Sequence, residues 1–254
     1  MKAITLKRLA LVVFGIGLLV TLLTLAAPAG VWLGLWDFRG GFAILQATFP
    51  FTSWIALACL IAALALGTVS KMNNTGNTLR VSSLAFIGAL LVGISWYIPS
   101  TFAARLSYPP IHDVSTDIEN PPGYVAIAPL RANAPNTMVY GAQEPMTPEE
   151  NARLQREAFP DLVPQIIAAS PQDVFQRSLA ALESMGLEIV AADPDEGRIE
   201  ATATTFWFRF KDDVVIRIRA QGNQTLVDAR SLSRVGRGDA GTNGLRLQEF
   251  FSLL

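Results

Sequence analysis

The stretch RIEATATTFWFRFKDDVVIRIRAQGNQTLVDARSLSRVGRGDAGTN, from Arg198 to Asn243, decides the fold of the second half of the chain. It holds most of the β-branched and aromatic residues of that half, and its turn residues divide it into three consecutive antiparallel strands. A glycine-rich turn then leads into a last helix. Because apolar and polar residues alternate along these strands, we expect a sheet whose two faces differ in character.

The clearest element of this stretch is a hairpin centred on Gly222-Asn223. A glycine-first pair suits a two-residue type II′ turn, which places Gln221 opposite Gln224. Counting back from this turn predicts one apolar face and one arginine-rich face. On the apolar face Ile218 opposes Val227 and Ile216 opposes Ala229, and on the other face Arg217 opposes Asp228, beside Arg219 and Arg230.

The composition indicates membrane segments joined to one modest domain. The chain has 254 residues, of which 51% are hydrophobic and only 16% are charged. The part after residue 105 is net acidic, which gives no electrostatic reason to expect nucleic acid as a partner. The only cysteine, Cys59, lies in an apolar run, so the sequence excludes a disulfide framework and a cysteine-based metal site.

Three apolar runs are long enough to cross the ~30 Å hydrocarbon core of a bilayer. They cover about residues 9–27, 52–69 and 81–98 and carry no ionisable residue, which favours an anchor over a transport path. The first run could also be a secretory signal, because Ala27-Pro28-Ala29 loosely matches a cleavage site, but its length favours an uncleaved helix. The aromatic segment Val31–Phe51 suits the lipid–water interface.

Lysine and arginine are unevenly divided between the short loops. The positive-inside rule therefore predicts a cytoplasmic N-terminus, and three crossings place everything after Phe102 on the outer face. In a bacterial inner membrane that face is the periplasm. The side predicted to be cytoplasmic holds Lys2, Lys7, Arg8, Lys71 and Arg80, and the other side holds only Arg39 and Arg105.

The expected fold class is α+β, with a membrane domain of three transmembrane helices over residues 1–104. Residues 105–170 hold too many prolines for long regular elements and too many apolar residues for a solvated linker. We expect this proline-rich belt to wrap the domain, with one short helix at 147–158 capped by Thr147. Residues 171–254 are predicted to form a four-stranded antiparallel meander sheet flanked by two helices on one face.

His112 is the only histidine, so any Ser-His-Asp mechanism must use it. Asp113 points the opposite way in an extended segment, so adjacency alone does not let it orient His112. The chain also lacks a G-x-S-x-G elbow. These observations favour a histidine bonded to backbone at the edge of the belt, and no cofactor is expected.

An oxygen-rich cluster next to His112 could hold a hard cation such as calcium. It consists of Asp113, Asp117, Glu119 and Asn120. Its spacing does not match an EF-hand loop, and turn formation before Pro121-Pro122 explains the same residues. We therefore favour a turn over a metal site.

Arginines and phenylalanines form the candidate binding surface. Phe206, Phe208 and Phe210 share one face of a predicted strand and need a cover, which could be the belt, lipid or a partner subunit. An apolar surface that ends in cations suits an acyl chain with an anionic head. Internal pairing with nearby acids is the favoured account of the arginines. The candidate ligand-binding residues are Phe206, Phe208, Arg217, Arg219, Arg230, Arg234 and Arg237.

Four phrases of the sequence resemble the bacterial membrane-anchored branch of domain-of-unknown-function family 1499. They are PPIHDVSTDIENPPGY, REAFPDL, RIEATATTFWFRFKDDVVIRI and VDARSLSRVGRGDAGTNGLRLQEF, and the resemblance covers about residues 108–253. The activity of that family is not established. The resemblance therefore implies a fold and a location, not a mechanism.

Together these features predict a non-enzymatic periplasmic binding or accessory module, anchored in a bacterial inner membrane by three spans. The expected partner is the lipid bilayer, and an anionic amphiphile is the candidate ligand. Two alternatives stay open, an accessory subunit of a larger inner-membrane complex and a periplasmic hydrolase that uses His112.

Overall fold

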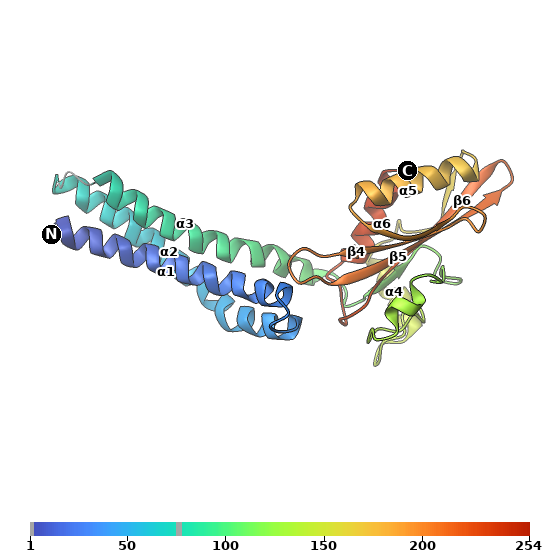
Figure 1. Cartoon of the computed structure of the whole chain (residues 1–254), viewed down its shortest axis with the longest axis horizontal. Coiled ribbons are helices and arrows are strands. Elements are labelled where there is room, and N and C mark those ends of the chain that lie inside the picture. Colours follow the sequence, from blue (N-terminus) through green and yellow to red (C-terminus); the bar gives the residue numbers. More distant parts are fainter. Residues whose placement is uncertain (1–2, 75–77) are drawn as a thin grey trace. The chain divides into compact units, whose positions relative to one another are not determined.

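A computed structural model describes residues 3–74 and 78–254, which belong to two compact units (Figure 1). The first unit is Met1–Ala104 and the second is Arg105–Leu254. The chain mixes helix and sheet, and every strand among the described residues lies in the second unit.

The first unit consists of three long helices, α1 (Ala3–Trp32), α2 (Phe38–Met72) and α3 (Thr78–Ala103). All three are long and apolar enough to cross a membrane. All three helices are longer than the predicted apolar runs. In particular, α2 begins at Phe38, inside the segment that the sequence assigned to the lipid–water interface. The Asp37 carboxylate starts this helix by accepting hydrogen bonds from the N–H groups of Arg39 and Gly40.

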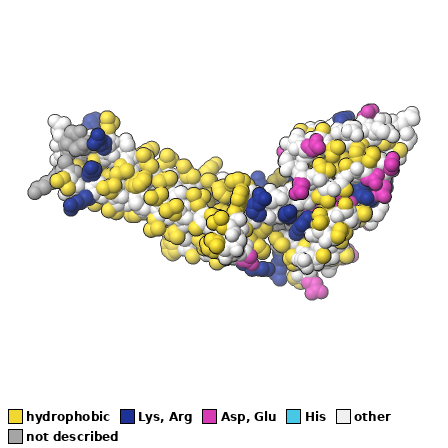
Figure 2. All heavy atoms as spheres, viewed as in Figure 1, with side chains coloured by type: hydrophobic (Ala, Val, Ile, Leu, Met, Phe, Trp, Pro, Cys, Tyr) yellow, Lys and Arg dark blue, Asp and Glu magenta, His cyan; other side chains and the backbone are white. Residues whose placement is uncertain are grey.

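Small residues let α1 and α3 approach closely. A Cβ atom added at Gly17 would lie 2.2 Å from the carbonyl oxygen of Gly88, so only glycine fits there. One turn further, the hydroxyl groups of Thr21 and Ser95 lie 3.0 Å apart across the two helices. The outer surface of the unit is largely apolar, and Figure 2 shows a group of Lys and Arg side chains at the end that carries the N-terminus.

The second unit contains one antiparallel sheet in the order β1-β6-β5-β4-β3, with β2 also paired to β6. The predicted four-stranded meander is present as β3 to β6, but the predicted strand number is wrong. Two short belt segments pair with the free edge of β6 and enlarge the sheet. The strands are β1 (Asp113–Ser115), β2 (Gln165–Ile167), β3 (Glu188–Asp193), β4 (Arg198–Thr204), β5 (Lys211–Gln221) and β6 (Gln224–Ser233).

The β5–β6 hairpin has the predicted register. Gln221 pairs with Gln224, and Arg217 pairs with Asp228. Gly222 has a φ of +62°, the positive value that the first central residue of a type II′ turn requires. The register therefore separates an apolar face from an arginine-rich face, as predicted.

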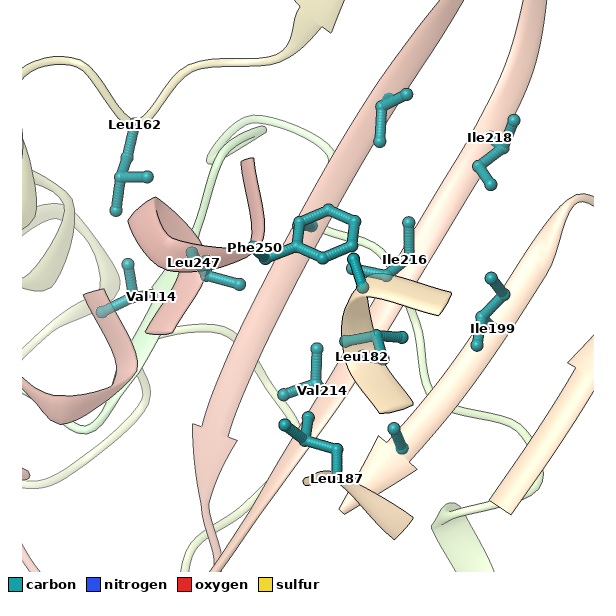
Figure 3. Close-up of a cluster of buried hydrophobic side chains, with 14 of the residues drawn as sticks. Val114, Leu162, Leu182, Leu187, Ile199, Val214, Ile216, Ile218, Leu247 and Phe250 are labelled. Atoms are coloured by element: carbon teal, nitrogen blue, oxygen red, sulfur yellow. The ribbon is translucent and has the colours of Figure 1, made fainter. Parts of the chain in front are cut away.

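Helices α5 (Pro171–Ser184) and α6 (Thr242–Ser252) cover the apolar face of the sheet. Leu182 of α5 and Phe250 of α6 are fully buried against Ile216 and its neighbours on β4 to β6 (Figure 3). The belt also contributes to this core through Val114 and Leu162. Two helices on one face match the prediction.

The belt consists mostly of short elements, some of which lie on the other face of the sheet. They include the 3-10 helices η1 (Ala104–Ser107) and η2 (Ala128–Arg131) and the helix α4 (Pro148–Ala158). Thr147 caps α4 as predicted, because its hydroxyl accepts a hydrogen bond from the N–H of Glu150. Tyr124 and Ile127 pack on Val215 and Leu232 in a second, smaller core.

Residues 205–210 form a loop and not the predicted continuation of a strand. β4 ends at Thr204 and β5 begins at Lys211. Arg209 has a φ of +55°, which no strand residue adopts. Consequently Phe206, Phe208 and Phe210 do not share a strand face, and that part of the sequence prediction is wrong.

Candidate functional site

The arginine-rich face of the sheet is covered by the belt. Side chains alternate along β5, so Val214 and Ile216 point to the helices while Asp213 and Arg217 point to the belt. We call the belt-side surface of β4, β5 and β6 the charged face. Its four carboxylates, with the belt's Asp113 included, are almost fully buried, and each has an arginine within ion-pair distance. These carboxylates are Asp113, Glu200, Asp213 and Asp228.

Asp113 forms a buried ion pair with Arg230. The guanidinium Nε donates to Oδ1 at 2.9 Å and Nη2 donates to Oδ2 at 2.7 Å, the bidentate geometry of strong ion pairs. Arg230 also donates to the carbonyl oxygen of Met138 and lies over the ring of Tyr124. Burial opposes the charge of Arg230, but Asp113 outweighs it and raises the pKa of the guanidinium. This pair fastens two belt segments to β6.

Glu200 binds the backbone of the belt directly. Its Oε1 accepts hydrogen bonds from the N–H groups of Val125 and Ala126 at 2.9 and 3.1 Å, and its Oε2 accepts one from Ile127 at 2.8 Å. Three successive N–H groups around a carboxylate form an anion nest. The guanidinium of Arg198 lies 3.0 Å from Oε1 and neutralises the buried charge.

Asp213 lies between two arginines. Arg131 of η2 donates to it at 2.5 Å and Arg234 donates at 2.9 and 2.8 Å, while the Thr202 hydroxyl donates at 2.7 Å. Burial opposes ionisation, but these hydrogen bonds outweigh it and hold the pKa of Asp213 below its usual value. Arg131 also donates to the carbonyl oxygen of Ser233, so this cluster fixes η2 on the end of β6.

Asp228 pairs with the predicted partner Arg217 and also with Arg219. The carboxylate accepts from Arg217 Nε at 2.9 Å and from Arg219 Nη2 at 2.6 Å. Arg217 reaches further to the Asp117 carboxylate of the belt, at 3.0 Å. The predicted internal pairing of these arginines is therefore confirmed.

A second polar group lies on the helix side of the sheet, at the start of α6. Asn243 receives a hydrogen bond from the Ser231 hydroxyl at 2.6 Å and donates to the carbonyl oxygen of His112 at 2.9 Å. Arg246 pairs with Asp212 at 2.8 Å. The sequence reasoning missed this group, although the polar residues that interrupt the alternation near the end of β6 were a usable signal.

His112 is buried, and its side chain bonds to the belt and to the glycine-rich loop. Its Nδ1 lies 2.8 Å from Oε1 of Gln143, and the backbone of Arg237 also bonds to the ring. Burial lowers the pKa of His112, so the ring is neutral at pH 7. Asp113, the nearest carboxylate in sequence, is bound to Arg230. Among the residues that the structure describes, no serine hydroxyl is hydrogen-bonded to the His112 ring. A hydrolytic role for His112 therefore stays a prediction.

The predicted cation cluster is dispersed. Asp113 faces Arg230, and Asp117 accepts a hydrogen bond from the N–H of Asn120 at 2.9 Å, as a turn-forming residue does. Glu119 is exposed. Within residues 3–74 and 78–254, no group of three or more His, Cys, Asp and Glu residues could hold a metal ion.

The candidate ligand residues do not form one surface. Arg217 lies six residues along β5 from Lys211, which follows the phenylalanine loop, so about 20 Å of strand separates them. Arg237 is exposed in the glycine-rich loop. A hollow of about 280 Å³ lies on the charged face beside Gly123 and Arg198. It is slightly smaller than the ~300–1,000 Å³ of most ligand sites.

The elements of this site fall within the region that a known protein family matches. The model of the family described as "Protein of unknown function (DUF1499)" matches residues 113–254, which is more than half of the chain. The match includes the belt from Asp113 onward and the whole sheet, and it begins one residue after His112. No curated protein matches the chain.

Proposed function

The chain belongs to the DUF1499 family, and on that premise we propose that it is a non-enzymatic, membrane-anchored periplasmic module with an accessory role. The membrane in question is the bacterial inner membrane, and the N-terminus is cytoplasmic. The module acts by presenting a closed folded domain at the bilayer surface, to a neighbouring membrane protein or to an anionic lipid-like ligand.

One observation carries this proposal, the internal pairing of the buried charges. Catalytic acids and bases need free access to a substrate. Here Asp113, Glu200 and Asp213 accept hydrogen bonds from arginines or backbone N–H groups of the same domain. Their role is to hold the belt on the sheet, which supports a binding or structural task over chemistry.

The same pairing favours an accessory role over capture of an amphiphile. Arg230 and Arg234, which were candidates for an anionic head group, are bound to Asp113 and Asp213. Releasing Arg230 to a ligand would leave the buried carboxylate of Asp113 without its counter-charge, which costs about 3–5 kcal/mol. Lipid capture by these residues would therefore require the belt to move.

The distribution of basic residues supports the orientation. Four exposed basic residues lie at those helix ends of the first unit that the positive-inside rule assigns to the cytoplasm. They are Lys7, Arg8, Lys71 and Arg80. A reporter that is active only outside the cytoplasm should work when fused after Leu254 and fail when fused after Asn74. The reverse pattern would reject the proposed orientation.

Native mass spectrometry of the full chain, purified in mild detergent, tests the accessory role. We expect a protein partner at a fixed ratio to the chain. A phospholipid that remains bound without a protein partner would instead establish the amphiphile-binding version. A chain that carries neither would overturn the proposal, and the hydrolase alternative would then be tested with His112→Ala.

A further inference from the structure

The β4–β5 loop, residues 205–210, is a compact and ordered turn. The N–H of Thr205 donates to the carbonyl oxygen of Phe210 at 2.8 Å, and the N–H of Phe210 donates to the Thr205 hydroxyl at 2.9 Å. The N–H of Arg209 donates to the carbonyl oxygen of Thr205 at 3.1 Å. These bonds close the loop on itself without a strand partner.

The side chains of this loop are those of a membrane-interface segment. Four of the six residues are aromatic, and Phe206 is 66% exposed, whereas the core residues Phe175 and Phe250 are 4% and 0% exposed. The rings of Phe206 and Trp207 pack edge to face at 5.1 Å and so form one aromatic knob. Tryptophan and other aromatic rings concentrate at the head-group level of bilayers.

Cations flank the aromatic knob. Arg209 is exposed inside the loop, and Lys211 is exposed directly after it. Aromatic rings combined with Lys and Arg suit the interface with anionic phospholipids, which bind such segments through apolar burial and charge attraction.

Chain connectivity relates this loop to the point where the chain enters the domain. Arg105 lines one hollow together with Ala203 and Thr204, the last residues of β4. Because Arg105 is only two residues beyond the end of α3 at Ala103, it cannot lie more than ~7 Å of chain from that helix. The loop that follows Thr204 therefore lies at the end where the chain enters the domain.

We propose that the β4–β5 loop inserts its aromatic side chains into the lipid–water interface and binds anionic phospholipid head groups through Arg209 and Lys211. The occupant of this surface is the bilayer. The inference rests on the proposed membrane anchoring, not on the accessory role.

A single-cysteine labelling experiment tests this proposal on the full chain. Cys59 is the only cysteine, so Cys59→Ala provides the background. Phe206→Cys carries an environment-sensitive fluorophore in the loop, and Asn223→Cys carries the same fluorophore in the exposed β5–β6 turn at the other end of β5. Both proteins are reconstituted into phosphatidylethanolamine–phosphatidylglycerol vesicles with and without brominated lipids.

We expect brominated lipid to reduce the Phe206→Cys signal severalfold and to leave the Asn223→Cys signal unchanged. Quenching of both labels by aqueous iodide, with no effect of brominated lipid, would overturn the proposal. Protection of the Phe206→Cys label from both quenchers would also overturn it, because protein and not lipid would then cover the loop. Matching thermal unfolding of the two labelled proteins verifies the fold.

A second variant tests the head-group contribution. Arg209→Gln with Lys211→Gln should reduce the brominated-lipid quenching of the Phe206→Cys label in vesicles that contain phosphatidylglycerol, and have little effect in neutral vesicles. Unchanged quenching in both kinds of vesicle would show that Arg209 and Lys211 do not bind the head groups. Neither labelling result alters the protein partner detected by native mass spectrometry, so failure of the loop proposal and failure of the proposed function are distinguishable.

Discussion

Glu200→Gln is the sharpest perturbation of the contact between belt and sheet. The carboxylate of Glu200 is fully buried and accepts hydrogen bonds from three successive N–H groups, of which Val125 and Ala126 share Oε1 and Ile127 uses Oε2. Glutamine fills the same volume but has only one acceptor oxygen. Its NH₂ group must face an N–H donor, whichever way the amide is turned.

The magnitude follows from these contacts. If the amide oxygen of the new glutamine keeps the hydrogen bonds from the N–H groups of Val125 and Ala126, the charge-assisted hydrogen bond from the N–H of Ile127 is lost. This loss costs about 1.5–3 kcal/mol. The remaining two bonds weaken because the acceptor is no longer charged. We therefore expect a loss of about 3 kcal/mol in the free energy of unfolding. With a urea dependence of ~1–3 kcal/mol per molar, the midpoint should fall by about 1–3 M.

Pulse proteolysis of the full chain in urea measures this change without separating the domain from its anchor. Glu188→Gln is the matched control, because Glu188 is an exposed carboxylate on the neighbouring strand β3. The control should leave the midpoint unchanged. Equal midpoints for Glu200→Gln and Glu188→Gln would refute the role assigned to the nest.

Three further predictions use the same assay. Asp228→Ala should cost about 2–3 kcal/mol, because Asp228 is buried but Arg217 keeps Asp117 as a partner, and a double-mutant cycle with Arg217→Ala that shows no coupling would reject the pair. Burial lowers the pKa of His112, so the unfolded chain binds that proton first and stability should fall as pH drops below about 6.5; His112→Gln should remove this loss. Burial raises the pKa of Asp239 to about 6, so the folded chain binds that proton before the unfolded chain does. As the pH falls from 6 toward 4, protonation of this group should therefore add at most about 3 kcal/mol to the free energy of unfolding. An Asp239→Asn variant with the same pH profile as the parent would contradict this.

Local patterns predicted much of the fold. The Gly222-Asn223 turn determined the register of β5 and β6, since alternation then leaves no choice of face. Caps also act locally, which is why Thr147 marked the start of α4 correctly. Three apolar runs indicated three helices that are able to span a membrane. Each of these features depends on residues within a few positions of one another.

The remaining features depend on contacts between distant residues. Nothing near Glu200 in sequence indicates that it binds N–H groups 73 to 75 positions earlier. The added strands β1 and β2 are too short to show a pattern of their own and form only because β6 offers a free edge. The loop at 205–210 was mistaken for strand because aromatic residues are typical of strands, while Arg209 in a left-handed conformation has no sequence signal.

Hydrogen exchange of the belt tests most directly the claim that this domain is closed by its internal ion pairs. The amides of Val125, Ala126 and Ile127 are the reporters, in the full chain reconstituted into lipid nanodiscs. The account predicts that they exchange as slowly as the amides of β5 and open with them as one cooperative unit. Fast exchange at these three amides, with β5 still protected, would contradict it and would make the charged face accessible to a ligand.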